Sequence, residues 1–343
     1  MSTTAISLDL SKPRRSPWII GPANDLGWFI FSALGGYATL ALFKLGMPMA
    51  PVLIAFIFLI DGPHVWSTMT RTYLDKFERK RRRTQFLLVI PLFLVGPLMW
   101  TLGQSHLFFI LAYGWAYFHH AKQEYGFVML YKAKNNDRDA FDMKLDRYFI
   151  MASIILPYCW YLQATHDLST RFALVRVLVG LVISAYIVLT VVFIGRQLLK
   201  FEKGEAINLP KLALLAMSVP LQWLAFSYAV HHEFGILAAA IPINTFHALQ
   251  YQRLMWFHNK NHYSSNEIKA RSGLAAIINR SVIFYLAAGL VTNFLFHAIT
   301  GAGLQLQGIW VSVFWGVSFS HYFLDSKIWR ARGDKELAAA LRL

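Results

Sequence analysis

The chain has 343 residues, of which 56% are hydrophobic and only 15% are charged, and its mean hydropathy is +0.43. Soluble domains carry about 25% charged residues, and no polar stretch here is long enough to form one, so the composition excludes an ordinary soluble protein. The net charge of +15 does not indicate nucleic-acid binding, because the basic residues flank apolar runs, where anionic headgroups and membrane topology account for them.

A polar tail, residues 1–24, precedes about ten apolar runs that are long enough to cross a bilayer as helices. The tail's Lys12, Arg14 and Arg15 stand before a full-length run, which favours a retained first helix over a cleaved signal peptide. The sequence therefore predicts an all-α, polytopic transmembrane helix bundle, with a single domain at 25–328 and a tail at 329–343. The predicted spans are 25–46, 49–74, 85–103, 105–131, 146–165, 172–196, 210–231, 234–256, 281–299 and 308–328.

The connections between these spans alternate in charge. Basic residues gather in every second connection and in both tails, whereas the opposite connections contain only Lys44, Arg171 and Arg176. Because connections rich in Lys and Arg stay in the cytoplasm, we expect both termini to be cytoplasmic. A wrong number of spans would destroy the alternation, so the charge bias also supports the count of ten.

The twelve histidines divide between the two sides of this topology. Five fall at the external side, where an amphipathic side chain at the interface is a sufficient explanation: His106, His166, His231, His232 and His297. The other seven lie in the cytoplasmic half of a span or just beyond it: His64, His119, His120, His247, His258, His262 and His321. Ionisable groups within a bilayer are costly unless they are paired or coordinated, so this second group favours a metal site.

Three carboxylates stand three or four residues from these histidines, a spacing that places two side chains on one face of a helix. They are Asp61 before His64, Glu124 after His120 and Asp325 after His321. His258 and His262 share this spacing, and such pairs on facing helices build di-iron sites in bundle cores. Imidazole and carboxylate suit iron, zinc or manganese, whereas the single cysteine, Cys159, excludes disulfides within the chain and sites made of thiolates alone.

We therefore expect the seven cytoplasmic histidines to be metal ligands and the three carboxylates to be catalytic, either as ligands or as groups that orient the imidazoles. An isolated His/Asp pair in a span is alternatively a proton relay or a packing hydrogen bond. Pro63 predicts a kink just before His64, because proline frees backbone groups of the preceding turn.

Two family resemblances rest on these residues. His119-His120 and the His258-x-x-x-His262 spacing resemble the histidine boxes of the membrane non-haem iron enzymes, the lipid desaturases and hydroxylases, although a full set of His-x-x-His-His boxes is absent from the chain. Gly62-Pro63-His64, His247 with His258, and His321-Tyr-Phe-Leu-Asp325 resemble motifs of the bacterial Brp/Blh-type β-carotene oxygenases. Together the resemblances imply one or two non-haem iron ions and an apolar substrate.

The function expected from these features is a non-haem iron oxygenase, that is a hydroxylase, desaturase or cleavage enzyme, acting on an apolar lipid or isoprenoid with dioxygen. Zinc and manganese remain alternative metals, and the basic face suits an acidic, ferredoxin-type electron donor. The expected location is a bacterial inner (plasma) membrane, with the site facing the cytoplasm. Alternative functions are a zinc-dependent lipid hydrolase, a haem-binding electron carrier and a proton-coupled transporter that uses Asp61 and Asp325.

Overall fold

The computed structural model of the protein describes residues 16–300 and 309–343, and within these ranges the chain is helical, with no strand. Residues 1–15 of the predicted N-terminal tail and residue 308, the first of the tenth predicted span, lie outside the described residues. The first half contains α1 (Pro22–Asn24), η1 (Asp25–Ile30), α2 (Ala33–Lys44), α3 (Met49–Phe56), η2 (Ile57–Asp61), α4 (Gly62–Arg71), α5 (Lys76–Arg81), α6 (Arg83–Val89), α7 (Leu92–Thr101), α8 (Ser105–Lys134) and α9 (Ala140–Thr165). The second half contains α10 (Leu168–Arg171), α11 (Ala173–Glu202), α12 (Leu209–Ala229), α13 (Leu237–His262), α14 (Asn266–Ser272), α15 (Leu274–Ile278), α16 (Val282–Thr300), α17 (Ile309–Ile328) and α18 (Lys335–Ala340).

Each predicted span corresponds to one long helix or to a run of shorter helical segments. Among the described residues, five such stretches are long and apolar enough to cross a membrane: Pro22–Lys44, Met49–Arg71, Arg83–Thr101, Ala173–Glu202 and Leu209–Ala229. α8 and α13 are also long, but they carry buried polar side chains, among them His119, His120 and Glu124 of α8 and His247 and His258 of α13. The predicted all-helical fold is confirmed, and the total of ten spans and the orientation stay predictions.

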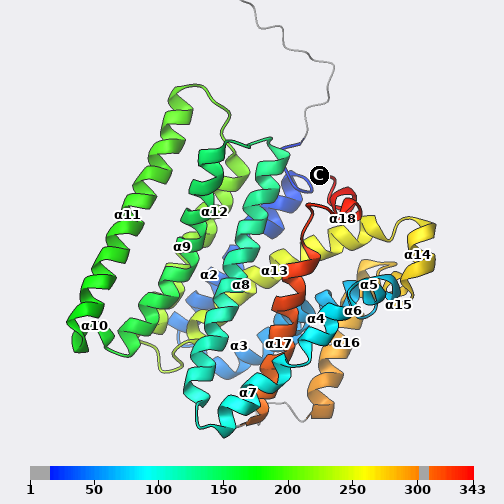
Figure 1. The fold of residues 1–343 in the computed structure, drawn as a ribbon, viewed down its shortest axis with the longest axis horizontal. Helices are drawn as coiled ribbons and strands as arrows, with labels where there is room; N and C mark the ends of the chain where they lie inside the picture. Colours follow the sequence, from blue (N-terminus) through cyan, green and yellow to red (C-terminus); the bar gives the residue numbers. More distant parts are fainter. Residues whose placement is uncertain (1–15, 301–308) are drawn as a thin grey trace, which may run out of the picture.

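Helix α13 lies at the centre of the bundle, and most of its residues are buried. It packs against α2, α4, α12 and α18, and Figure 1 shows it (yellow) crossing the bundle obliquely. Its contact with α2 depends on Gly36, where an added Cβ would lie only 2.7 Å from the carbonyl oxygen of Pro242. A central helix shielded in this way can carry polar side chains that a lipid-facing helix could not.

Helix α11 has the opposite character. It is apolar between Arg176 and Arg196, its most hydrophobic stretch is only 6% buried, and it stands at the edge of the bundle in Figure 1 (bright green). Exposed apolar side chains such as Leu174, Leu181 and Val188 cover it. A helix that is apolar all round and yet exposed is suited to contact with lipid.

One end of the molecule brings together segments that are distant in sequence. The Asn135 side chain donates a hydrogen bond to the carbonyl oxygen of Pro17 at 3.1 Å, and the Lys134 ammonium group donates to the carbonyl oxygen of Arg342 at 2.8 Å. The first described residues, the connection between α8 and α9 and the C-terminal residues therefore meet, as the charge pattern predicts. Which side of a membrane this end faces stays a prediction.

A buried ion cluster fixes three helices at the same end. The Asp146 carboxylate of α9 accepts hydrogen bonds from Lys132 of α8 at 2.7 Å and from Lys211 of α12 at 3.0 and 3.1 Å. The three side chains are each only 1% exposed. Charges so far from water are tolerated only when they are paired, so α8, α9 and α12 are held in one relative position.

A neighbouring group of charges attaches α11 to this cluster. Arg196 donates from Nε to the Asp142 carboxylate at 2.7 Å, and Lys200 forms an ion pair with the same carboxylate. Asp137 lies in the connection between α8 and α9. Burial alone would raise the pKa of its carboxyl group, but the ammonium groups of Lys132, Lys211 and Lys200 lower that pKa below its ordinary value. The exposed helix α11 is therefore anchored by ionised, paired groups.

Close packing of α7 against α17 gives a first testable prediction. A Cβ added at Gly96 would lie 2.6 Å from both the Cβ and the carbonyl oxygen of Ser312, too close for either backbone to tolerate without shifting. We expect Gly96→Ala to destabilise the protein by about 1–3 kcal/mol, the usual cost of overpacking. Thermal unfolding of the purified protein, followed by circular dichroism, measures this effect.

Gly126→Ala on α8 is the matched control, because nothing lies within 4 Å of an added Cβ there. Alanine favours the helical backbone over glycine by roughly 0.5–1 kcal/mol, so this variant should be at least as stable as the parent. Equal unfolding temperatures for the two variants would contradict the close approach of α7 to α17.

Candidate metal centre

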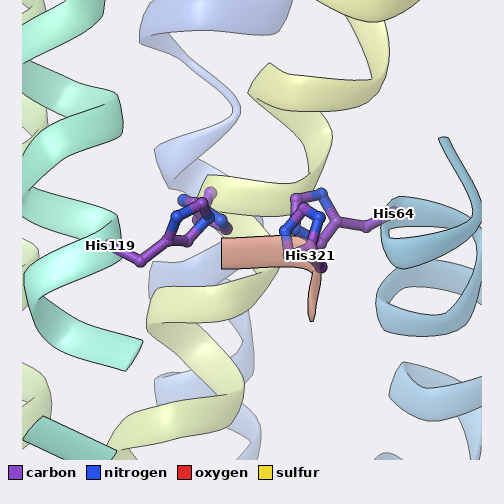
Figure 2. Close-up of side chains that lie close together, drawn as sticks. His64, His119 and His321 are labelled. Carbon is purple, nitrogen blue, oxygen red and sulfur yellow. The ribbon is translucent and has the colours of Figure 1, made fainter. Parts of the chain in front are cut away.

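Four histidines from four different helices converge in the bundle. His64 lies on α4, His119 on α8, His247 on α13 and His321 on α17, and each is at least nine-tenths buried. Each offers one ligand atom, and the four atoms all lie within 4.8 Å of one another. Figure 2 shows the rings of His64, His119 and His321 pointing toward a common centre from separate helices. This arrangement can hold a metal ion.

The local structure of α4 places His64 in this group. The π-helical turn η2 ends at Asp61, and Pro63 follows in the first turn of α4, inside the continuous helical run Met49–Arg71. Its missing N–H group leaves a carbonyl group of the preceding turn without a helical partner. The Asn293 side chain of α16 donates to the carbonyl oxygen of Ile57 at 3.1 Å, in the turn before the proline. The sequence predicts a kink at Pro63, and the structure has a change from π- to α-helix immediately before it; π-helical turns are frequent at functional sites.

Unsatisfied ring nitrogens distinguish this cluster from an ordinary buried hydrogen-bond network. Nδ1 of His64, Nε2 of His119, Nε2 of His321 and both ring nitrogens of His247 are buried without a hydrogen-bond partner among the described residues. Leaving one such group unpaired costs about 1–3 kcal/mol. A single metal cation would satisfy all four rings at once, and imidazole is a common ligand of iron, zinc and copper. The residues present therefore fit a metal ion.

The ring of His321 is held by a hydrogen-bond network at Nδ1, on the side opposite its unpartnered nitrogen Nε2. The Thr68 hydroxyl lies 2.8 Å from Nδ1 of His321 and donates to Asp325 at 2.8 Å, and the Tyr251 hydroxyl donates to the same carboxylate oxygen at 2.7 Å. Because Thr68 donates to Asp325, its oxygen is free to accept from Nδ1–H of His321. That tautomer leaves Nε2 of His321 as the metal-binding atom, which is the usual way in which oxygen acceptors orient a ligating imidazole.

This network gives a second testable prediction. In Thr68→Val the hydroxyl that accepts from His321 is lost while the shape of the side chain is kept, so the ring loses its fixed orientation. Partners of this kind are worth roughly 10–100-fold in metal affinity, and we expect a loss in that range by competition with a chelator. Thr72→Val is the control, because the Thr72 hydroxyl bonds only to the carbonyl oxygen of Thr68 within the same helical segment. Equal losses in the two variants would contradict the orienting role.

His120 and the predicted carboxylates lie beside the four histidines but outside the group. The His120 ring is 4.2 Å from that of His247, and Glu124, one turn further along α8, is buried with both carboxylate oxygens unpartnered among the described residues. Asp61 is partly buried at the end of η2, three residues before His64. The Tyr322 ring stacks on His119 at 4.6 Å. Within the described ranges, no other group of three or more His, Cys, Asp or Glu side chains meets the geometry of a metal site.

His258 and His262 lie on the same helix as His247, about three turns or more further along α13. Their rings stack on each other at 5.2 Å, and His258 contacts Trp329 at 5.8 Å. A helix rises 1.5 Å per residue, so His258 lies about 16 Å along the axis from His247, too far to share one ion with it. Of the seven predicted ligands, the structure thus gathers four, leaves His120 adjacent and places His258 and His262 elsewhere.

The histidines assigned to the external side stay apart from this group. His106 and His166 contact each other at 5.3 Å, and His232 contacts Phe43 and Tyr228. Packing between aromatic rings accounts for these contacts.

Sequence reasoning did not identify Thr68 as part of the site. A signal was present, because Thr68 follows His64 by four residues and so shares its helical face. Tyr251 stands in the same relation to His247, and its ring lies 4.7 Å from that of His64. Threonine and tyrosine are so common in helices that this spacing acquires meaning only when the facing helices are known.

No family model, no curated protein and no solved structure matches this chain. The resemblances to desaturases and carotene oxygenases therefore stay predictions, and a function has to be argued from the geometry of the four histidines.

Proposed function

We propose that the protein is a multi-pass membrane oxygenase that binds one non-haem iron ion on His64, His119, His247 and His321 and oxidises an apolar lipid or isoprenoid with dioxygen. The observation that carries the proposal is the convergence of four buried imidazoles, with their ligand atoms within 4.8 Å of one another, in a helical protein whose described residues include five candidate membrane spans. Buried ionisable side chains inside a membrane protein are expensive and mark functional sites.

The number of histidines favours iron over catalytic zinc. Catalytic zinc sites keep three protein ligands and one position for water, whereas four protein ligands complete the tetrahedral shell of a structural zinc ion. Iron accepts more than four ligands, so four imidazoles leave room for dioxygen. Bound iron would supply the activation of dioxygen at this position, as in other non-haem oxygenases with open coordination positions. Manganese, with similar coordination, is the second choice.

The chain's own residues hold and insulate the ion. Thr68, Asp325 and Tyr251 fix the ring of His321, and the stacking of Tyr322 on His119 at 4.6 Å restricts a second ring. Aromatic and aliphatic side chains around these groups keep water away, which prevents side reactions of reactive intermediates. Glu124, buried one turn beyond His120, is positioned to exchange a proton near the site without being a ligand.

The location proposed for the protein is a bacterial inner membrane with the site toward the cytoplasm. The basic connections support this orientation through the positive-inside rule. An apolar substrate would then enter from the bilayer, while electrons arrive from an acidic donor of the ferredoxin type at the basic face.

The alternative functions receive less support from the geometry. A haem group would need its two axial histidines on opposite faces of a wide porphyrin, and four imidazole nitrogens within 4.8 Å of one another leave no space for one. A proton-coupled transporter would rely on Asp61 and Asp325, but Asp325 is already engaged in orienting His321 through Thr68.

A direct test begins with the purified protein in lipid nanodiscs, loaded with Fe(II) under anoxia. Metal content is measured by mass spectrometry, and dioxygen consumption is measured with a reductant in the presence and absence of lipids extracted from the producing cells. Stoichiometric iron and lipid-dependent dioxygen consumption are the expected results. A protein that binds only zinc and releases lipid products without dioxygen would be a hydrolase, and a Soret band would indicate haem; either result overturns the proposal.

A further inference from the structure

A cavity of about 230 Å³ opens between α4, α7 and α17, and His321, one of the four histidines, lines it. Val65 and Met69 of α4, Phe93 of α7 and Val317 and Leu324 of α17 form its apolar walls. Thr68 and His321 also line it, so the cavity borders the hydrogen-bonded pair that positions one of the candidate metal ligands.

Exposure increases along the cavity from its inner to its outer residues. Thr68 and His321 are only 2% exposed, whereas Val65, Met69, Phe93 and Val317 are partly exposed. Phe93 belongs to the stretch Arg83–Thr101, a candidate membrane span whose most hydrophobic part is only 11% buried. Leu94 and Leu98, beside Phe93 on α7, are exposed apolar side chains. The mouth of the cavity therefore faces the region where a bilayer would lie.

The hydroxyl groups of Ser320 and Thr68 in the lining are already hydrogen-bonded within the protein, whereas Nε2 of His321 is without a partner among the described residues. The Ser320 hydroxyl donates to the carbonyl oxygen of Gly316 at 2.7 Å, and the Thr68 hydroxyl is engaged with His321 and Asp325. An occupant would thus find apolar contacts and few free donors or acceptors. This lining selects a hydrocarbon over a polar ligand, because an unpaired polar group in an apolar site loses its hydrogen bonds to water.

The volume limits how much of a ligand can enter. Pockets that enclose a whole drug-sized molecule usually measure roughly 300–1,000 Å³, and this cavity is smaller. A bulky, compact molecule would not fit, whereas one section of a linear chain would, with the rest of the molecule remaining among the lipids.

We propose that this cavity binds one section of a long, linear hydrocarbon chain, which enters laterally from the bilayer between α4, α7 and α17 and is held against His321. The role of the bound section as a substrate rests on the proposed oxygenase function, but its binding does not. The position of the bound chain along the cavity would decide which of its carbon atoms come closest to the metal centre, and so would set the regiochemistry of the reaction.

Photolabelling tests this binding site without requiring activity. The protein is placed in phosphatidylcholine nanodiscs with palmitic acid that carries a mid-chain diazirine, irradiated, digested and analysed by mass spectrometry. We expect labelled peptides from 65–73 and 317–324. Val317→Trp, which fills the cavity, should abolish this labelling, and Val188→Trp, on the lipid-facing helix α11, should leave it unchanged. If Val317→Trp does not fold, Val65→Phe fills the cavity from the opposite wall.

Competition identifies the type of chain. Unlabelled palmitic acid and unlabelled geranylgeraniol are compared as competitors, and stronger displacement by one of them shows whether the site prefers an acyl or an isoprenoid chain. Label confined to α11 and other lipid-facing helices, or labelling of the cavity peptides that survives both filling variants, would overturn the proposal.

Metal content is measured on the same samples, so that the two proposals fail separately. Labelled cavity peptides in a protein that binds no metal would sustain the binding site and defeat the oxygenase. Stoichiometric iron in a protein whose cavity is never labelled would sustain the oxygenase proposal and defeat the hydrocarbon-binding site.

Discussion

His119→Ala is expected to abolish stoichiometric metal binding. His119 contributes one of the four ligand atoms that lie within 4.8 Å of one another, and alanine removes it without altering the fold of α8, since alanine is a strong helix former. Loss of a group that merely orients a ligand costs roughly 10–100-fold in metal affinity, so loss of the ligand itself should exceed about 100-fold. Mass spectrometry of the metal and competition with a chelator measure the effect.

His120→Ala provides a closely matched control. The two histidines are neighbours on α8 and both are buried, but His120 is not one of the four that share the centre. The His120 variant should keep its metal with an affinity close to that of the parent. If instead His120→Ala loses the metal and His119→Ala retains it, the centre is built differently from the one described, with the His120–His247 contact at its core.

Asp146→Asn is expected to produce the largest loss of stability. The carboxylate pairs with Lys132 and Lys211, and all three side chains are 1% exposed. Asparagine would leave the Asp137 carboxylate, at 3.0 Å from Lys132 and 3.6 Å from Lys211, to balance both buried ammonium groups. Removing one member of a buried ion pair usually costs about 3–5 kcal/mol. Thermal unfolding in detergent, followed by circular dichroism, should show a large decrease in the midpoint temperature.

Glu336→Gln is the control for this second variant. Glu336 pairs with Arg271 at 2.6 Å, but the two side chains are 41% and 30% exposed, and pairs of this kind contribute about 0–1 kcal/mol. A similar decrease in the midpoint temperature of both variants would contradict this argument. It would mean that the charges around Asp146 are hydrated in the folded protein and that burial does not determine how much these ion pairs stabilise it.

The coarse features of the fold and of the site follow from the sequence because they depend on local patterns. Runs of apolar residues predict helices whatever surrounds them, and the structure contains a helix or helical run at each predicted span. Histidines at His64, His119, His247 and His321 stand out for the same reason: imidazoles inside apolar runs need an explanation even before their neighbours are known.

The composition of the four-histidine group does not follow from such patterns. Both His119 and His120 are buried on the same helix, and only the position of α13 and α17 decides which of them meets the others. For His258 the spacing in the sequence was sufficient. It lies three helical turns from His247, which is farther than two ligands of one ion can be from each other. The network of Thr68, Tyr251 and Asp325 spans three helices, so it becomes visible only in three dimensions.

The distribution of the ligands along the chain determines when the centre can form during biosynthesis. The first, on α4, emerges from the ribosome about 250 residues before the last, on α17, because the four helices follow one another along the chain. A nascent chain that lacks α17 has three of the four imidazoles and no Thr68–His321 pair. An ion held by all four histidines could therefore bind only after α17 has been inserted, and a cell would have to deliver it to a bundle that already contains all four helices.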